Sequence, residues 1–367
     1  VRYGSAQSFL GLSWYLSDFD NKYQSLGWQQ PFSTAPGAEA PEMAQAPDNR
    51  FQQLRLSGGY ALPQWRTVIS VSAAIGQIEQ DAAFLDYTTN ATLTPEALPR
   101  GSLDGEVDTT NVVVSFNSRP LPKVRLRGSY RYDERDNSTP VTDWTRVIVD
   151  LIDSGEPQAN MPYSYDRGHA KTSVEYAFRD NLRVSAGYEY RQVNRDLQEV
   201  AEQTTNEGWG QLRWQPKPWL DLRAKGGAAA RGVDRYDTTV AVSLGQNPLM
   251  RKYNLAYRYR EYGEVVASIM PLESPLSFSA SVLFADDDYK DSMLGLNGAE
   301  EFRATADVSW AVSESAALYL TYGRDALDAH QTGSEQFDAW DWSAFHEDRF
   351  DHVGVGMSYR PAEGALS

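Results

Sequence analysis

Four closely spaced aspartates are the side chains in this sequence that are best suited to binding an ion. Carboxylate oxygens are the ligands that Ca²⁺ prefers in proteins. Their spacing, however, lacks the glycine and the regular ligand positions of a helix–loop–helix calcium loop. The pattern therefore favours a solvated acidic loop over a calcium site, with Ca²⁺ kept as the alternative for Asp286, Asp287, Asp288 and Asp291.

No other group of residues predicts chemistry. The histidines are scattered, and His346-Glu347 is not followed by the second histidine of a zinc-protease motif. The sequence contains neither a phosphate-binding loop nor a nucleophile elbow. It has no cysteine, which excludes disulfides, thiolate metal sites and covalent haem attachment to this chain. We therefore expect that the protein is not an enzyme and carries no cofactor of its own.

The segment 168–192 shows the structural element that recurs along the chain. It reads as two strands of about ten residues joined by a tight turn at Arg179-Asp180-Asn181. Apolar and aromatic residues alternate with charged and small polar ones in both strands. The first strand has Ala170, Val174, Tyr176 and Phe178 on one face, and His169, Lys171, Glu175 and Arg179 on the other.

Two architectures place such a ribbon differently. A soluble β-sandwich buries the apolar face in a core, whereas a membrane barrel turns that face to lipid and the charged face to a wet lumen. No apolar run approaches the roughly 18 residues of a spanning helix, and spanning strands escape such a scan because every second residue is polar. Abundant tyrosine and tryptophan match the aromatic girdles of barrels, although soluble β-proteins also favour aromatic residues.

The connections between strands fall into two length classes. Short, proline-rich turns alternate with long polar stretches, which we expect to be loops over 17–49, 77–108, 133–166 and 325–348. We also expect one long strand over Tyr253–Ile269, with a bulge near Glu261. Sandwiches rarely sort their connections in this way. The sequence therefore predicts an all-β, antiparallel outer-membrane barrel of about 14 strands, with short periplasmic turns and long extracellular loops, in a single domain over residues 1–367.

Charge is distributed unevenly between the predicted lumen and the loops. With 34 basic against 50 acidic residues, the net charge of −16 argues against a nucleic-acid partner. The predicted lumen face is nevertheless basic, so it could hold an acidic partner. The alternative is a wall whose charges neutralise one another. The predicted lumen residues are Arg55, Lys123, Arg125, Arg127, Arg131, His169, Lys171, Glu175, Arg179, Arg183, Glu189, Arg191, Arg223 and Lys225.

A short segment resembles a known family. The stretch NPLMRKYN resembles a segment that precedes a long strand in the MtrB/PioB outer-membrane barrels. The matching residues are Asn247, Pro248, Leu249, Arg251, Lys252, Tyr253 and Asn254, whereas Tyr257 and Tyr259 depart from the pattern. Members of that family are longer, so the resemblance implies a shortened member or part of a larger barrel. If the sheet closes by itself, we expect the first strand, over Gln7–Leu16, to pair with the last, over Asp351–Tyr359.

The resemblance also implies a function. Such a barrel sheathes and positions a periplasmic multihaem c-type cytochrome, so that electrons cross the bacterial outer membrane, often to an extracellular cytochrome. The haems would belong to the partner, as the absence of cysteine here requires. The alternative is a general or substrate-specific porin, with the same wall around an open lumen.

Overall fold

One large sheet dominates the part of the chain that the computed structural model describes. That part comprises residues 1–32, 36–37, 40–90, 92–93, 97–145, 147–149, 152–153, 157–243, 245–335 and 339–360. Within these ranges the sheet has 16 strands, of which β1 and β17 are very short. The long strands are β2 (Ser8–Phe19), β5 (Asn49–Leu62), β6 (Thr67–Gln80), β7 (Gly105–Leu121), β8 (Val124–Asn137), β13 (Tyr165–Arg179), β14 (Leu182–Arg195), β15 (Glu202–Lys217), β16 (Leu220–Val233), β18 (Arg258–Ile269), β19 (Leu276–Asp288), β20 (Leu294–Ser313), β21 (Ala316–Gly333) and β22 (Trp342–Tyr359).

Most of the shorter elements belong to the long connections. They are β1 (Arg2–Gly4), β3 (Ser25–Gly27), β4 (Glu42–Ala44), η1 (Pro63–Trp65), β9 (Asp143–Trp144), β10 (Val147–Val149), β11 (Ile152–Asp153), β12 (Gln158–Ala159), α1 (Thr238–Ser243) and β17 (Met250–Arg251). No helix in the described ranges is both long and apolar enough to cross a membrane.

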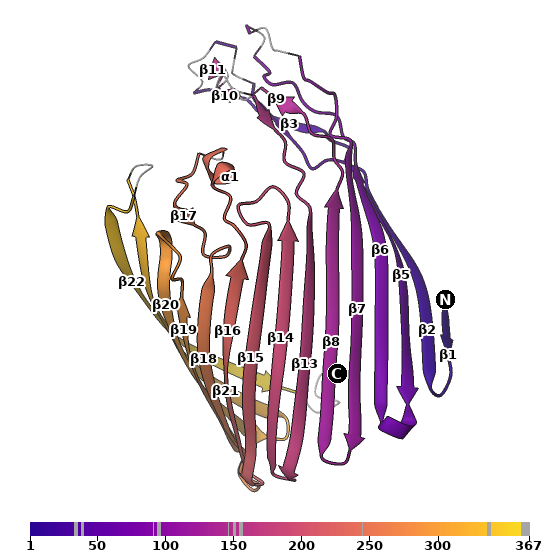
Figure 1. The fold of residues 1–367 in the computed structure, drawn as a ribbon, viewed down its shortest axis with the longest axis vertical. Helices are drawn as coiled ribbons and strands as arrows, with labels where there is room; N and C mark the ends of the chain where they lie inside the picture. Colours follow the sequence, from indigo (N-terminus) through magenta and orange to yellow (C-terminus); the bar gives the residue numbers. More distant parts are fainter. Residues whose placement is uncertain are drawn as a thin grey trace, which may run out of the picture.

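The long strands follow one another in space as they do in sequence. Each pairs antiparallel with its chain neighbours, in the order β2-β5-β6-β7-β8-β13-β14-β15-β16-β18-β19-β20-β21-β22. Figure 1 shows short turns at one end of the sheet, the turn end, and long connections with α1 and β17 at the other, the loop end. The prediction of an all-β antiparallel sheet with two classes of connection is therefore confirmed, and the long strands number fourteen, as expected.

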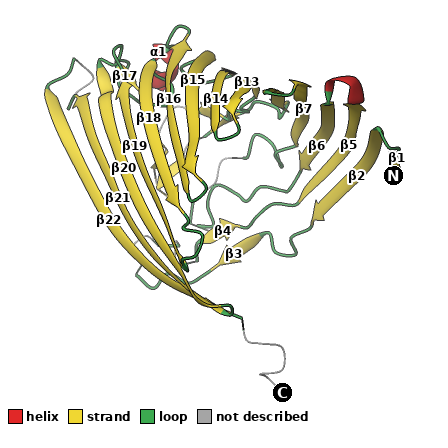
Figure 2. Ribbon diagram, turned by 90° about the horizontal axis from the view of Figure 1, so that it is seen from below, coloured by secondary structure: helices red, strands yellow, loops and turns green. Residues whose placement is uncertain are grey.

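The sheet curves into an open trough. Figure 2 views it from the turn end, with β1 and β2 at one margin and β22 at the other. Among the described residues, β1 pairs with β2 alone and β22 with β21 alone. The pairing of first and last strands that closure of this stretch by itself would need is therefore not seen.

Cross-strand register defines the two faces of the sheet. Directly paired residues point the same way and successive residues point opposite ways. Glu189 pairs with Lys171 on one side and Glu207 on the other, and the face that contains these residues is called the inner face. Its carboxylates are crowded, with the Glu189 and Glu207 side chains each 15 % exposed. That crowding is expected on the concave side of a curved sheet.

The outer face carries the apolar residues without a covering layer. Val174 is 43 % exposed, Tyr176 40 % and Val184 38 %, so a sandwich core is excluded for this part of the sheet. On β14 the outer residues stay apolar or aromatic from Leu182 to Tyr190, about 26 Å at roughly 3.3 Å per residue. After allowance for strand tilt, that length is close to the apolar band of about 25 Å in outer-membrane barrels.

Several strands extend beyond the predicted boundaries. The segment 325–348, expected to be a loop, lies mostly in β21 and β22, and residues 105–108 and 133–137 lie in β7 and β8. At these positions polar residues occur on both faces, so the strict alternation that identifies a strand is lost where the strand leaves the apolar band. The loops are correspondingly shorter than predicted.

The long strand predicted over Tyr253–Ile269 is also corrected. A turn over 253–256, in which Leu255 N–H donates to the Lys252 carbonyl at 2.8 Å, precedes β18, which starts at Arg258. The register of β18 with β16 and β19 runs without interruption, so no bulge occurs at Glu261. Glu261 lies on the outer face and accepts a hydrogen bond from the Tyr259 hydroxyl at 3.0 Å. The apparent change of parity therefore marks the edge of the apolar band.

Candidate functional site

Most of the predicted lumen residues share the inner face. Register places Arg55, Arg125, Arg127, Arg131, His169, Lys171, Glu175, Arg183, Glu189, Arg191, Arg223 and Lys225 there, on β5, β8, β13, β14 and β16. The other two lie at the turn end. Lys123 precedes β8 in the turn after β7, and Arg179 ends β13 beyond a register shift at Ala177. For these two, the strict alternation assumed from the sequence stops at the turn.

A charged cluster lies at the centre of the inner face, around Glu189. Its Oε2 lies 3.2 Å from Lys171 Nζ, 2.9 Å from Arg191 Nη2 and 3.0 Å from His169 Nε2. Arg191 also approaches Glu207 at 3.6 Å, and the Tyr262 hydroxyl donates to Glu207 at 2.7 Å. Residues of β13, β14, β15 and β18 are thus joined in one polar network.

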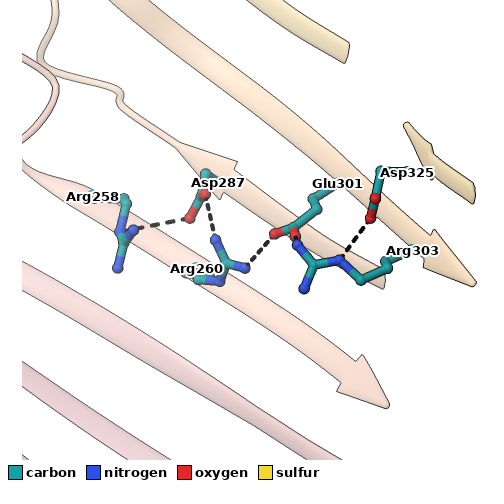
Figure 3. Close-up of polar contacts among 6 residues, drawn as sticks. All are labelled: Arg258, Arg260, Asp287, Glu301, Arg303 and Asp325. Carbon is teal, nitrogen blue, oxygen red and sulfur yellow. Dashed lines mark hydrogen bonds and ion pairs between the residues drawn. The ribbon is translucent and has the colours of Figure 1, made fainter. Parts of the chain in front are cut away.

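A second network crosses the inner face nearer the loop end. Arginines and carboxylates alternate from β18 to β21, and the contacts link residues on the same strand, on adjacent strands and, for Arg260 and Glu301, on strands separated by β19 (Figure 3). The contacts are Arg258–Asp287 at 3.6 Å, Arg260–Asp287 at 2.7 Å, Arg260–Glu301 at 2.8 Å, Arg303–Glu301 at 2.9 Å and Arg303–Asp325 at 2.7 Å. This network was not predicted, because Asp287 and Asp325 fall in segments that the sequence predicts to be loops. The alternation of Glu301 and Arg303 was the available signal.

The turn end of the inner face has a different charge balance. Arg125 has a partner there, with Nη1 3.4 Å from Glu175, and so has Arg213, with Nε 2.9 Å from Asp221. The side chains of Arg66, Arg119, Arg127 and Arg183 have no hydrogen bond or ion pair with any described residue. The wall is therefore self-neutralised towards the loop end and has unpaired positive charge towards the turn end.

The segment over Asn247–Asn254 is folded tightly at the loop end. Within it, β17 pairs in parallel with β20. Lys252 Nζ forms an ion pair with Glu199, a residue that is 2 % exposed. The Arg251 guanidinium lies 4.3 Å from the centre of the Tyr236 ring. The Asn247 side chain accepts the Leu249 N–H at 2.9 Å. These contacts give the polar residues of the segment structural partners within the loop.

Inner-face side chains fasten this segment to the wall. Gln203 Nε2 donates to the Asn254 carbonyl at 3.2 Å, and Arg231 Nε donates to the Ala256 carbonyl at 2.8 Å. Around these contacts lie Val200, Leu255, Ala256, Tyr289 and Leu294, which are all at most 4 % exposed. Residues 247–256 therefore form a packed structure, the motif cap, which covers the inner face at the loop end of β15 and β16.

Two groups beneath the motif cap have shifted pKa values. Burial, as the main cause, raises the pKa of the Tyr236 phenol. Hydrogen bonds from the Thr239 hydroxyl and N–H, at 2.7 and 2.9 Å, lower the pKa of Asp237, which immediately precedes α1. Both groups are outside the spanning strands, and each pKa is shifted away from neutrality, so the Tyr236 phenol stays neutral and the Asp237 carboxylate charged at physiological pH.

The calcium alternative is not supported by the geometry. Asp286, Asp287 and Asp288 are the last three residues of β19, so Asp287 faces inward and its two neighbours outward. Asp287 is engaged by two arginines, Asp288 lies 3.3 Å from Lys290, and Asp291 follows in a turn. Alternation along a strand thus separates carboxylates that a loop would have brought together. No group of three or more histidine or acidic residues suited to a metal occurs within the described ranges.

Comparison with known proteins shows the family to which this chain belongs. The profile of the MtrB/PioB outer membrane beta-barrel porin family matches residues 1–366. The "Outer membrane protein MtrB" of Shewanella baltica (strain OS185) is 29 % identical over 352 residues, which is 96 % of this chain and 49 % of that protein. This chain therefore spans about half the length of the curated relative.

Two solved structures share the fold. The copper transporter OprC has a TM-score of 0.60 at 12 % identity, over 99 % of this chain and 56 % of OprC. The ferric-catecholate import receptor Fiu of E. coli K12 has a TM-score of 0.51 at 13 % identity, over 97 % of this chain and 53 % of Fiu. At these identities the likeness concerns architecture alone.

Proposed function

Because this chain belongs to the MtrB/PioB family of outer-membrane β-barrel porins, we propose that it sheathes and positions a multihaem c-type cytochrome for electron transfer across the outer membrane. Membership of this family places the chain in the outer membrane, in a porin-like class. We propose that it has no enzymatic activity of its own. The cytochrome is the proposed occupant of the lumen. A second, extracellular cytochrome is the corresponding proposal for the loop end.

The observation that carries the proposal is the composition of the inner face. It combines dense polar networks with unpaired arginines, and one charged face serves as the wall of the whole trough. A wall of this kind suits a hydrated protein surface with complementary negative charge. With no cysteine, the chain cannot attach c-type haem covalently, so the redox centres would be on the partner.

A sheath leaves the chemistry to its occupant. The low dielectric of the bilayer outside the barrel opposes ion leakage, and the apolar outer face keeps the wall in that layer. The inner charges that have no partner within the wall would hold the cytochrome in one register along the membrane normal. The electrons themselves would pass between haems of the partner.

The second candidate is a diffusive porin, and the description of the family as a porin favours it. Single-channel conductance separates the two. A barrel purified with its occupant should conduct ions poorly if it is a sheath, whereas a porin should conduct well in the same preparation.

Co-purification tests the proposal directly. The tagged protein is isolated from native membranes in mild detergent, and covalently bound haem is detected by peroxidase staining of the eluted proteins. A haem-bearing protein in stoichiometric amount supports the sheath. Its absence from every mild preparation would reject it.

A further inference from the structure

The inner face at the turn end contains a cavity of about 780 Å³ among β6, β7, β8, β13, β14 and β15. Its lining includes Arg66, Arg119, Arg127, Lys171 and Trp209. We propose that this cavity, the turn-end basic site, binds a cluster of carboxylates on the surface of the protein held in the lumen. The inference rests on the proposed function. It adds that the partner binds to this region of the inner face, through contacts between arginines and carboxylates.

The cations of the turn-end basic site are available to a ligand. Arg66, Arg119 and Arg127 have exposed side chains, and none has an ion-pair partner among the residues described. The one acid in the lining is Glu189, which is already engaged by Lys171, Arg191 and His169. Many of the other inner arginines pair with carboxylates, as in the network of Arg260 and Arg303. The turn-end basic site therefore lacks the internal anions that the rest of the wall supplies.

The backbone fixes where these arginines stand. Arg66 has φ of 45°, in the left-handed region, and its N–H donates to the Pro63 carbonyl at 3.1 Å, which closes η1. Its own carbonyl accepts the Arg119 N–H at 3.3 Å, so two arginines from different turns are anchored next to each other. Arg127 follows on β8, directly across from Asn117. A preformed arrangement of this kind lowers the entropy cost of binding.

The floor of the cavity is made of small residues. Ser70, Ser115 and Ser129 lie in one register row across β6, β7 and β8, and Lys171 continues that row on β13. Their short side chains leave the volume open and offer hydroxyl donors. On one side the Trp209 ring covers Gly187, where an added Cβ would lie 2.3 Å from the ring. The ring thus provides a rigid flank.

The extent of the turn-end basic site indicates the size of its ligand. The three unpaired arginines extend from the start of β6 to β8, which is two strand spacings, about 10 Å at roughly 4.8 Å each. A protein surface bearing several carboxylates can give each of these guanidinium groups its own carboxylate, whereas a single small carboxylic acid cannot. Guanidinium groups bind carboxylates by paired, charge-assisted hydrogen bonds, which accounts for arginine at three of the four positions.

The test compares two charge-matched triple variants in the complete barrel from native membranes. R66Q/R119Q/R127Q removes the unpaired arginines, and R213Q/R223Q/R303Q removes the same charge from arginines that have carboxylate partners. Retention of the haem-bearing protein on the immobilised barrel is measured against salt concentration. We expect the first variant to bind at least about tenfold more weakly than wild type at equal salt, and the second to stay near wild type. The proposal is overturned if the first variant retains the haem-bearing protein as well as wild type does, or if both variants lose it to the same extent.

Further arms keep the result interpretable. R66K/R119K/R127K preserves charge and should bind better than the glutamine variant but below wild type, and it replaces the glutamine variant if that one fails the heat-modifiable gel shift of a folded barrel. If wild type retains no haem protein, the proposed function fails. The turn-end basic site is then tested alone with labelled polyglutamate, which must bind wild type more tightly than the variant. Equal binding, or full displacement by equimolar inorganic phosphate, overturns the site itself.

Discussion

Arg260 on β18 lies directly across from Asp287 on β19, and Arg260 Nη1 is 2.7 Å from Asp287 Oδ2. The residues on either side of Asp287 in the chain, Asp286 and Asp288, point to the opposite face. Neighbouring residues on the strand therefore differ in role: the Asp287 carboxylate belongs to the inner network, whereas Asp286 and Asp288 lie on the outer face. The same rule governs the long strands of the sheet and underlies the predictions on β14 and β18 that follow.

Adjacent valines on β18 should respond oppositely to a charge. Val265 lies on the outer face and is 55 % exposed, whereas Val266 lies on the inner face across from Arg223. We expect V265R to destabilise the barrel by about 2–4 kcal/mol, the cost of an arginine facing lipid near the midplane. V266R should be tolerated because its side chain reaches water in the lumen. Urea unfolding in liposomes measures both, and equal costs would contradict the assignment of faces.

The motif cap should depend on its ion pair. In K252A, Glu199, whose side chain is 3 % exposed, loses its cationic partner. We expect a local loss of about 1–3 kcal/mol, the range for a buried group left unsatisfied. Hydrogen exchange at the Leu255 and Ala256 amides should accelerate, because both donate to the Lys252 carbonyl within the cap.

K290A is the matched control for the motif cap. Its ammonium pairs with Asp288 at 3.3 Å, but the Lys290 side chain is 71 % exposed. Exchange at the cap amides should be unchanged in K290A. A similar acceleration in both variants would mean that the cap does not rely on the contact between Lys252 and Glu199.

Alkaline pH should loosen the motif cap. Burial raises the pKa of Tyr236 above the usual value of about 10. A group whose pKa is raised on folding contributes stability at pH values below its unfolded pKa, and that contribution is lost as pH rises through the folded value. The cap is therefore expected to be stable near neutrality and to weaken above about pH 10. A tyrosinate absorbance titration should lose a late-titrating component in Y236F, and an unchanged late phase would contradict the prediction.

The packing of Trp209 against β14 gives a test of the inner wall. An added methyl group at Gly187 would lie 2.3 Å from Trp209 Cζ2, whereas one at Gly210 would meet nothing within 4 Å. We expect G187A to cost about 1–3 kcal/mol through overpacking and to displace the ring from Lys225, which lies 5.1 Å from its centre. G210A should be near neutral. The unfolding midpoints of G187A and G210A measure the two costs. A G187A midpoint equal to that of wild type would contradict the prediction and show that the Trp209 ring is free to move.

The sequence predicted the fold best where lipid imposes a pattern. Alternation across Val174, Tyr176 and Val184 identified the outer face because every second residue there must be apolar, and all three are exposed outward. Beyond the apolar band the constraint vanishes. The prediction that Asp287 and Asp325 lie in loops is therefore wrong, since they lie in β19 and β21.

The candidate site was predictable only in part. Parity alone placed residues such as Arg125 and Glu189 on the inner face, yet it could not identify the pairs they form. Those pairs depend on which strands are neighbours and at what register, as the contact between Arg260 and Glu301 across β19 shows. The motif cap was recognisable as a segment, but its packing against Arg231 involves contacts between distant parts of the chain.

The account depends most on which face of the sheet meets lipid, and the absence of cysteine allows a direct measurement. Single variants R183C, V184C, S185C and A186C along β14 are reconstituted in liposomes and treated separately with a water-soluble and a lipid-soluble maleimide. We predict a period of two, with R183C and S185C modified from water and V184C and A186C from lipid. Modification of V184C and S185C by the same reagent to the same extent would contradict the assignment of an outer apolar face and an inner charged one.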